Sequence, residues 1–204
     1  MPFPVFRLRF DQVKTNPVAS KFSILGFFQL VFFVFLSNAV NAQLGFPFCE
    51  KFSNNQTQGA TVFGGNARLV DGVLRLTDAV VDQNGFMYVD IPFPSTYGIK
   101  ATFEYFSYGG NGADGVTAFL FDANTPIFNP GGFGGSAPRN NERGLSRAYL
   151  GIGFDEYGNF GNTAEGRNGG FFGVGTNLIP NSIVVRGPGD GFIGYPFVVG
   201  RRTM

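Results

Sequence analysis

Short apolar runs separated by turn residues recur along the chain at close spacing. They predict strands at 67–70, 73–77, 86–90, 99–108, 116–121, 148–155 and 182–186. Between the first two, Asp71-Gly72 is a two-residue turn of the kind that closes a type I′ hairpin. No window shows the 3.6-residue period of an amphipathic helix. The pattern therefore predicts an all-β fold, an antiparallel β-sandwich of two stacked sheets.

Two long segments, 122–147 and 159–175, interrupt this rhythm and are rich in Gly, with Pro in the first and Asn in the second. Loops of this length inside a compact domain are usually functional or disordered. Plain surface loops are the alternative, so the segments are candidate binding loops only if chemistry-bearing residues flank them.

Composition supports the β-rich interpretation and excludes several kinds of catalysis. The chain has 27 Phe and 31 Gly but no Trp and no His. Phe favours half-buried pleated surfaces, and Gly supplies turns between short strands. Without histidine, Ser-His-Asp and Cys-His catalysis and histidine-bound metals are impossible. The single cysteine, Cys49, cannot form an internal disulfide.

The N-terminal 42 residues have the organisation of an export signal. Four basic residues precede a mainly apolar run at 22–40, which ends in Val40-Asn41-Ala42. This pattern predicts a signal peptide at 1–42, cleaved before Gln43. An uncleaved membrane anchor is the alternative, because the run is about long enough to span a bilayer. In both cases the remainder is secreted or lies at the cell surface.

Charge argues against nucleic acid as a partner. After Ala42 the chain carries 11 basic and 13 acidic residues, a net charge of −2. No basic stripe remains that could follow a phosphate backbone.

Two motifs suggest enzymatic chemistry but do not fit their context. Residues 110–115 spell G-x-G-x-x-G, yet a predicted strand follows where a dinucleotide site needs a helix. Asp155 and Glu156 are neighbours at a strand end and should point to opposite faces. They therefore cannot flank one glycosidic bond, which disfavours a hydrolase.

The residues after the strand at 148–155 fit a cation site better than a hydrolase site. Asp155 and Asn159, with the backbone carbonyl of Tyr157 between them, offer three kinds of oxygen ligand in one turn. Hard cations such as calcium prefer such ligands. Asp and Asn are also ordinary turn residues, so this motif alone is weak.

Three motifs in order resemble those of legume-type (L-type) lectins. Ala113-Asp114-Gly115 precedes a strand, a Gly-Gly-Phe-Gly-Gly stretch follows at 131–135, and an apolar strand then ends in Asp-x-Tyr-x-Asn at 155–159. The resemblance spans about 48–199. It implies one concanavalin A-like domain at 43–204 that binds a glycan or polysaccharide without catalysis.

The resemblance also implies particular roles. Asp114 would accept hydrogen bonds from sugar hydroxyl groups, and the peptide bond before it would be cis. A backbone N–H within 131–135 would donate to the sugar, and Tyr157 or a nearby Phe would stack on it. The implied carbohydrate-binding residues are Asp114, Gly132, Gly134, Gly135 and Asn159. The implied calcium ligands are Asp155, Tyr157, Asn159 and Glu165.

The chain departs from the family in two respects. Gly153 stands where plant members have a glutamate for a second metal, and no histidine is present, so neither manganese nor zinc is expected. The family also has further strands beyond the position of Met204, so the sandwich would be incomplete at the C-terminus. Two other functions stay open: an adhesive or structural module without a working sugar site, and a polysaccharide hydrolase. A membrane would be a partner only through an uncleaved leader.

Overall fold

The computed structural model describes residues 8–13, 45–94, 96, 98–132, 137–138 and 141–203. Throughout these residues the regular elements are strands, apart from two 3-10 helices, η1 (Ser53–Asn55) and η2 (Ala164–Gly166). For the described residues, the prediction of an all-β fold is therefore confirmed at the level of secondary structure. None of the helical segments in this described part has the length and apolar character needed to cross a bilayer.

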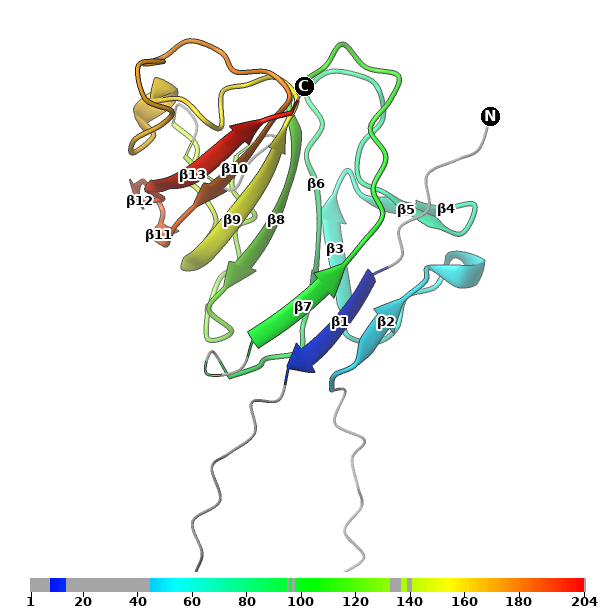
Figure 1. Cartoon of the computed structure of the whole chain (residues 1–204). Helices are drawn as coiled ribbons and strands as arrows, with labels where there is room; N and C mark the ends of the chain where they lie inside the picture. Colours follow the sequence, from blue (N-terminus) through cyan, green and yellow to red (C-terminus); the bar gives the residue numbers. More distant parts are fainter. Residues whose placement is uncertain are drawn as a thin grey trace, which may run out of the picture.

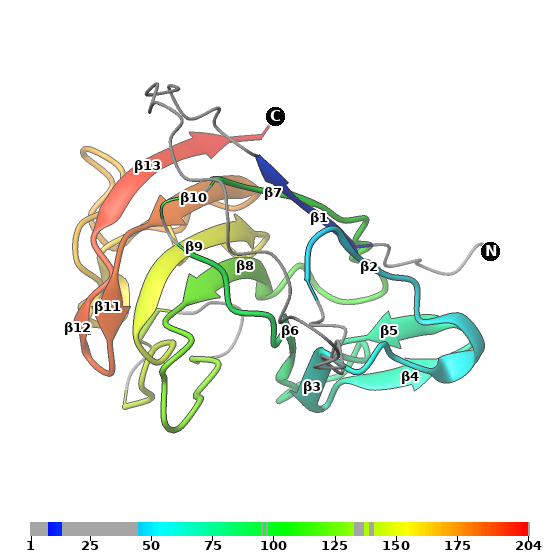
Figure 2. The ribbon, with the colours of Figure 1, turned by 90° about the horizontal axis from the view of Figure 1, so that it is seen from below.

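The largest sheet has six strands, all paired antiparallel. Its central path runs β8–β9–β10–β13, and the short strands β11 and β12 extend from β9. Figures 1 and 2 show it as one curved layer. Its strands are β8 (Gly115–Phe121), β9 (Ala148–Asp155), β10 (Ser182–Arg186), β11 (Gly189–Asp190), β12 (Ile193–Gly194) and β13 (Phe197–Arg202).

Three smaller sheets lie beside this layer (Figure 1). One has the order β2–β1–β7, one pairs β3 with β6, and one pairs β4 with β5. β1 comes from the segment expected to be the leader, and its backbone pairs with both of its neighbours. The strands are β1 (Leu8–Val13), β2 (Phe48–Glu50), β3 (Thr61–Gly65), β4 (Arg68–Val70), β5 (Val73–Arg75), β6 (Gly85–Val89) and β7 (Gly98–Thr102).

Most of the predicted strands are present. The two at 148–155 and 182–186 coincide with β9 and β10. Asp71 and Gly72 both have positive φ, 51° and 75°, as a type I′ turn between β4 and β5 requires. The G-x-G-x-x-G motif leads into β8 and not into a helix.

The strand predicted at 99–108 is too long, because β7 ends at Thr102. The pattern also missed β1, β2, β3, β11, β12 and β13; β1 falls in the predicted leader, and β11 and β12 have two residues each. β2 has only three residues, and β3 and β13 carry glycine within short apolar runs. Interruptions of this kind remove the regular alternation on which the prediction depends.

The main apolar core lies beneath the loop that joins β9 to β10. Leu145 and Val184 are fully buried there, and Tyr195 donates a hydrogen bond from its hydroxyl group to the Leu145 carbonyl at 2.8 Å. Phenylalanine fills most of the remaining space, from Phe119, Phe121, Phe128, Phe160, Phe171 and Phe197. Six phenylalanines thus contribute to this core.

Candidate functional site

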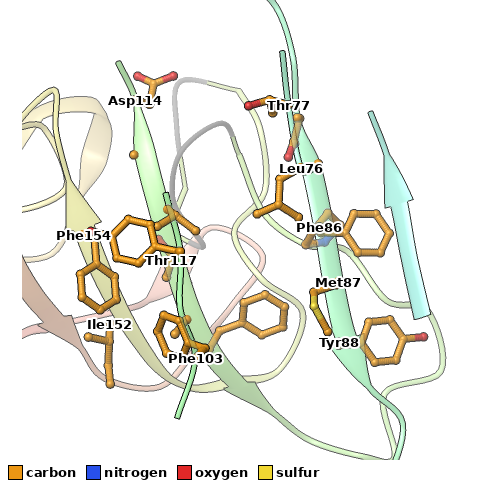
Figure 3. Close-up of a pocket in the computed structure, with 18 of the residues that line it drawn as sticks. Leu76, Thr77, Phe86, Met87, Tyr88, Phe103, Asp114, Thr117, Ile152 and Phe154 are labelled. Atoms are coloured by element: carbon orange, nitrogen blue, oxygen red, sulfur yellow. The ribbon is translucent and has the colours of Figure 1, made fainter. Parts of the chain in front are cut away.

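An open cleft of about 2630 Å³ lies between β6 and β7 on one side and the β8–β9 part of the large sheet on the other, and Tyr88 of β6 contacts Phe121 of β8 across it, with ring centres 5.4 Å apart. Figure 3 shows apolar side chains along it, including Phe86 and Tyr88 from β6 and Phe154 from β9. Asp114 and Thr77 lie toward the same end of the cleft, on opposite sides of it. Polar groups that converge beside an aromatic surface are typical of a binding site.

The start of β8 brings Asp114 against the turn that follows β9. Gly115 pairs with Asp155, and the Tyr157 N–H donates to the Asp114 carbonyl at 3.1 Å. Gly115 has φ +136°, and a Cβ there would lie 2.3 Å from the Phe154 carbonyl oxygen. Only glycine allows this approach, so the Ala-Asp-Gly motif joins the turn for a steric reason.

Most of the predicted site residues share the wall of this cleft: Asp114, Gly132, Tyr157, Asn159 and Glu165. The peptide bond between Ala113 and Asp114 is cis, as the resemblance implies. Gly134 and Gly135 lie outside the described residues.

Asp155 is placed differently, beneath the turn. It is 4% exposed, and its two carboxylate oxygens accept the N–H groups of Gly158 and Phe160, each at 2.7 Å. Burial raises the pKa of Asp155, and the backbone hydrogen bonds and the charge of Arg167 lower it by less. Glu156, the next residue, lines the cleft. Asp155 therefore shapes the turn from inside.

Arg186, at the end of β10, is the most extensively bonded side chain of this region and was not predicted as a site residue. It is 1% exposed, and all five of its N–H groups have carbonyl oxygens at 2.8–3.1 Å. The guanidinium also lies 5.4 Å from the centre of the Phe160 ring. The acceptors are the carbonyls of Phe160, Asn162, Asn168, Gly169 and Tyr195.

Arg186 stays charged at neutral pH. Burial, and then the neighbouring charge of Arg167, lower its pKa to about 10, while Asp155 opposes the shift. A cation therefore sits at the centre of the loop that carries Asn159.

Arg167 is a second buried cation in the same loop. It is 7% exposed, pairs with the Glu165 carboxylate at 2.7 Å, and donates to the Ala164 carbonyl at 3.1 Å. Its charge also acts on Asp155. Two of the expected calcium ligands, Asp155 and Glu165, thus interact with a guanidinium.

These surroundings do not fit the expected calcium site. Both oxygens of Asp155 already accept backbone N–H groups, and Arg167 is ion-paired with the Glu165 carboxylate. A divalent cation would have to share the Asp155 oxygens with these donors and overcome repulsion from the guanidinium. The residue types suit calcium, but their arrangement does not.

The space beside Gly153, where the resemblance implies a glutamate for a second metal, is filled by an aromatic ring. A Cβ on Gly153 would lie 2.3 Å from the ring of Phe160, which is 3% exposed. A glutamate side chain therefore has no room at position 153 unless Phe160 moves.

Replacing Gly153 with alanine is expected to destabilise the protein by about 1–3 kcal/mol, because the buried Phe160 ring must shift. Chemical denaturation would measure this. Gly59→Ala is the control, because a Cβ at position 59 would have open space around it. Gly72→Ala is unsuitable as a control, because Gly72 has a positive φ that would strain an alanine. Equal stability of Gly153→Ala and the wild type would contradict the packing described.

Aromatic side chains lie close to the rim and below it. The rings of Tyr105 and Phe154 are 5.1 Å apart, and Phe103 meets Phe154 edge-on at 5.9 Å. Burial and the nearby charge of Glu156 raise the pKa of Tyr105. Tyr157 is 42% exposed, so part of its ring is available to a ligand at the rim.

Comparison with protein-family models, curated proteins and solved structures found no match to this chain.

Proposed function

We propose that this chain binds glycans without catalysis, at the rim of the cleft between Asp114 and the 155–159 turn. The observation that carries the proposal is the hydrogen bond from the Tyr157 N–H to the Asp114 carbonyl, which holds the two motifs side by side. Residues separated by more than forty positions in the sequence thus form one polar rim beside an aromatic surface. A sugar-binding site needs a polar rim and an aromatic surface, because sugars carry hydroxyl groups and apolar C–H faces.

Each part of the rim has a role in this proposal. The Asp114 carboxylate accepts hydrogen bonds from sugar hydroxyl groups, and hydrogen bonds to a charged acceptor are the stronger kind. The Asn159 amide both donates and accepts. Gly132 offers its backbone at the cleft wall, and Tyr157 packs on an apolar sugar face.

The proposed architecture is the concanavalin A-like sandwich, exported to the cell surface or beyond. Its support is the all-β structure, the order of the three motifs and the signal-like N-terminus. Catalysis by the Asp155–Glu156 pair is disfavoured, because the Asp155 carboxylate is buried under backbone N–H groups whereas Glu156 lines the cleft.

A glycan array tests the proposal directly. The protein is expected to bind a restricted group of glycans, with no reducing sugar released from polysaccharides that carry them. Failure to bind any glycan would favour a structural or adhesive module. Release of reducing sugar would favour a hydrolase.

A further inference from the structure

We propose that the guanidinium groups of Arg186 and Arg167 replace calcium as the cations that order the β9–β10 loop, residues 156–181. Sugar binding at the rim is then independent of calcium. The second statement rests on the proposed function, whereas the first concerns the loop alone and can be tested without a glycan.

The first step is the coordination of Arg186. Four of its five carbonyl acceptors belong to the β9–β10 loop, at Phe160, Asn162, Asn168 and Gly169. A calcium ion orders a loop by collecting carbonyl and carboxylate oxygens around one positive charge. Arg186 does the same with a charge that is covalently part of β10, and its planar fork fixes the direction of each bond.

The second step is the charge around Asp155. In a calcium site this carboxylate would meet the metal, but here it caps the turn through Gly158 and Phe160, with Arg167 as the nearby positive charge. Arg167 also neutralises Glu165 through the 2.7 Å ion pair. Glu165 is therefore paired within the protein, and Asp155 has backbone N–H donors in place of a metal ion.

The third step is the far part of the loop, which is held by a neutral side chain. Asn162 is fully buried, and its amide nitrogen donates to the carbonyls of Thr176 and Asn177, each at 3.0 Å. Its amide oxygen accepts the Ala164 N–H at 2.9 Å. Both arms of the loop are thus fixed by protein groups.

The wild-type protein gives the first test. Thermal melting in a chelator and in millimolar calcium should give the same Tm, and calorimetric titration of calcium should show no stoichiometric binding. A site occupied only in the folded state would raise Tm by roughly 5–10 °C at calcium about 100 times the dissociation constant. Such a rise, or one calcium bound per chain, would overturn the proposal.

The Arg167→Gln variant distinguishes a role of Arg167 in place of the metal from a purely structural role. Removing this guanidinium leaves Glu165 without its ion-pair partner and Asp155 with Arg186 as the remaining cation, so the variant should acquire a calcium-dependent rise in Tm that the wild type lacks. Arg68→Gln is the matched control, because Arg68 forms an exposed ion pair with Asp78. If Arg167→Gln folds but its Tm ignores calcium, Arg167 does not stand in for the metal. If this variant does not fold, the wild-type measurements still decide the proposal.

The glycan array in the presence and absence of chelator separates the two proposals. Binding that persists in chelator supports both. Binding that requires calcium supports the sugar function and overturns the cation replacement. If no glycan binds in either condition, the proposed function fails, and the melting and titration experiments still decide whether the loop needs calcium.

Discussion

Replacing Asp114 with alanine is expected to reduce glycan affinity by a factor on the order of a hundred or more. The reason is that two hydrogen bonds to a charged acceptor, each contributing roughly 1.5–3 kcal/mol, would be lost. The fold should persist, because Asp114 lies at the cleft rim and precedes β8. Isothermal titration against a glycan selected on the array measures the change.

Two further variants make this result specific. Asp114→Asn removes the charge with little change in shape, so it should weaken binding by a smaller factor than alanine. Asp71→Asn removes one charge from the exposed hairpin turn between β4 and β5, where asparagine also tolerates positive φ. Its affinity should equal that of the wild type. Equal affinity of Asp114→Ala and the wild type would contradict the sugar-site assignment.

Replacing Arg186 with methionine is expected to cause the largest loss of stability, about 3–5 kcal/mol. The Asn168 carbonyl would keep the Phe197 N–H as a donor, but the other four carbonyls would lose the Arg186 N–H groups, and each buried acceptor left unpaired costs about 1–3 kcal/mol until water reaches it. For a chain of this size the loss corresponds to a fall in Tm of about 6–20 °C. Circular dichroism or calorimetric melting would measure it.

The comparison variants separate charge from hydrogen-bond geometry. Arg186→Lys keeps the positive charge but offers three donors in place of five, so its Tm should lie between those of the wild type and Arg186→Met. Arg202→Met alters an exposed residue at the end of β13 and should melt near the wild type. An Arg186→Met protein that melts within about 2 °C of the wild type would contradict the central role given to this side chain.

Much of the strand arrangement could be predicted from local pattern. β9 and β10 are continuous apolar runs bounded by turn residues, and the Asp71-Gly72 turn has residues that tolerate positive φ. These features act over a few residues and are visible in the sequence. β7 is different. The apolar positions continue to Tyr108, but the backbone leaves the sheet after Thr102, and only the pairing of β7 with β1 sets this end.

The candidate site was only partly predictable, because its side chains are oriented by distant groups. Oxygen-bearing residues at 155–159 suggest calcium in any sequence, yet the direction of the Asp155 carboxylate depends on which N–H groups the folded turn presents. An arginine at the end of an apolar strand, such as Arg186, is ordinarily expected to extend into solvent. Its burial depends on carbonyl groups from Phe160 to Tyr195, whose convergence no local pattern reveals.

The hydrogen bonds of Asp155 have a consequence for the thermodynamics of ligand binding. Asn159 lies between Gly158 and Phe160, and the N–H groups of both neighbours are fixed to this one buried carboxylate. The backbone that carries the Asn159 amide is thus preorganised before any sugar arrives. Ordering a mobile loop on binding costs entropy, and that loss is small where the loop is already rigid. Association should therefore proceed as docking to a preformed rim, with little change in backbone conformation.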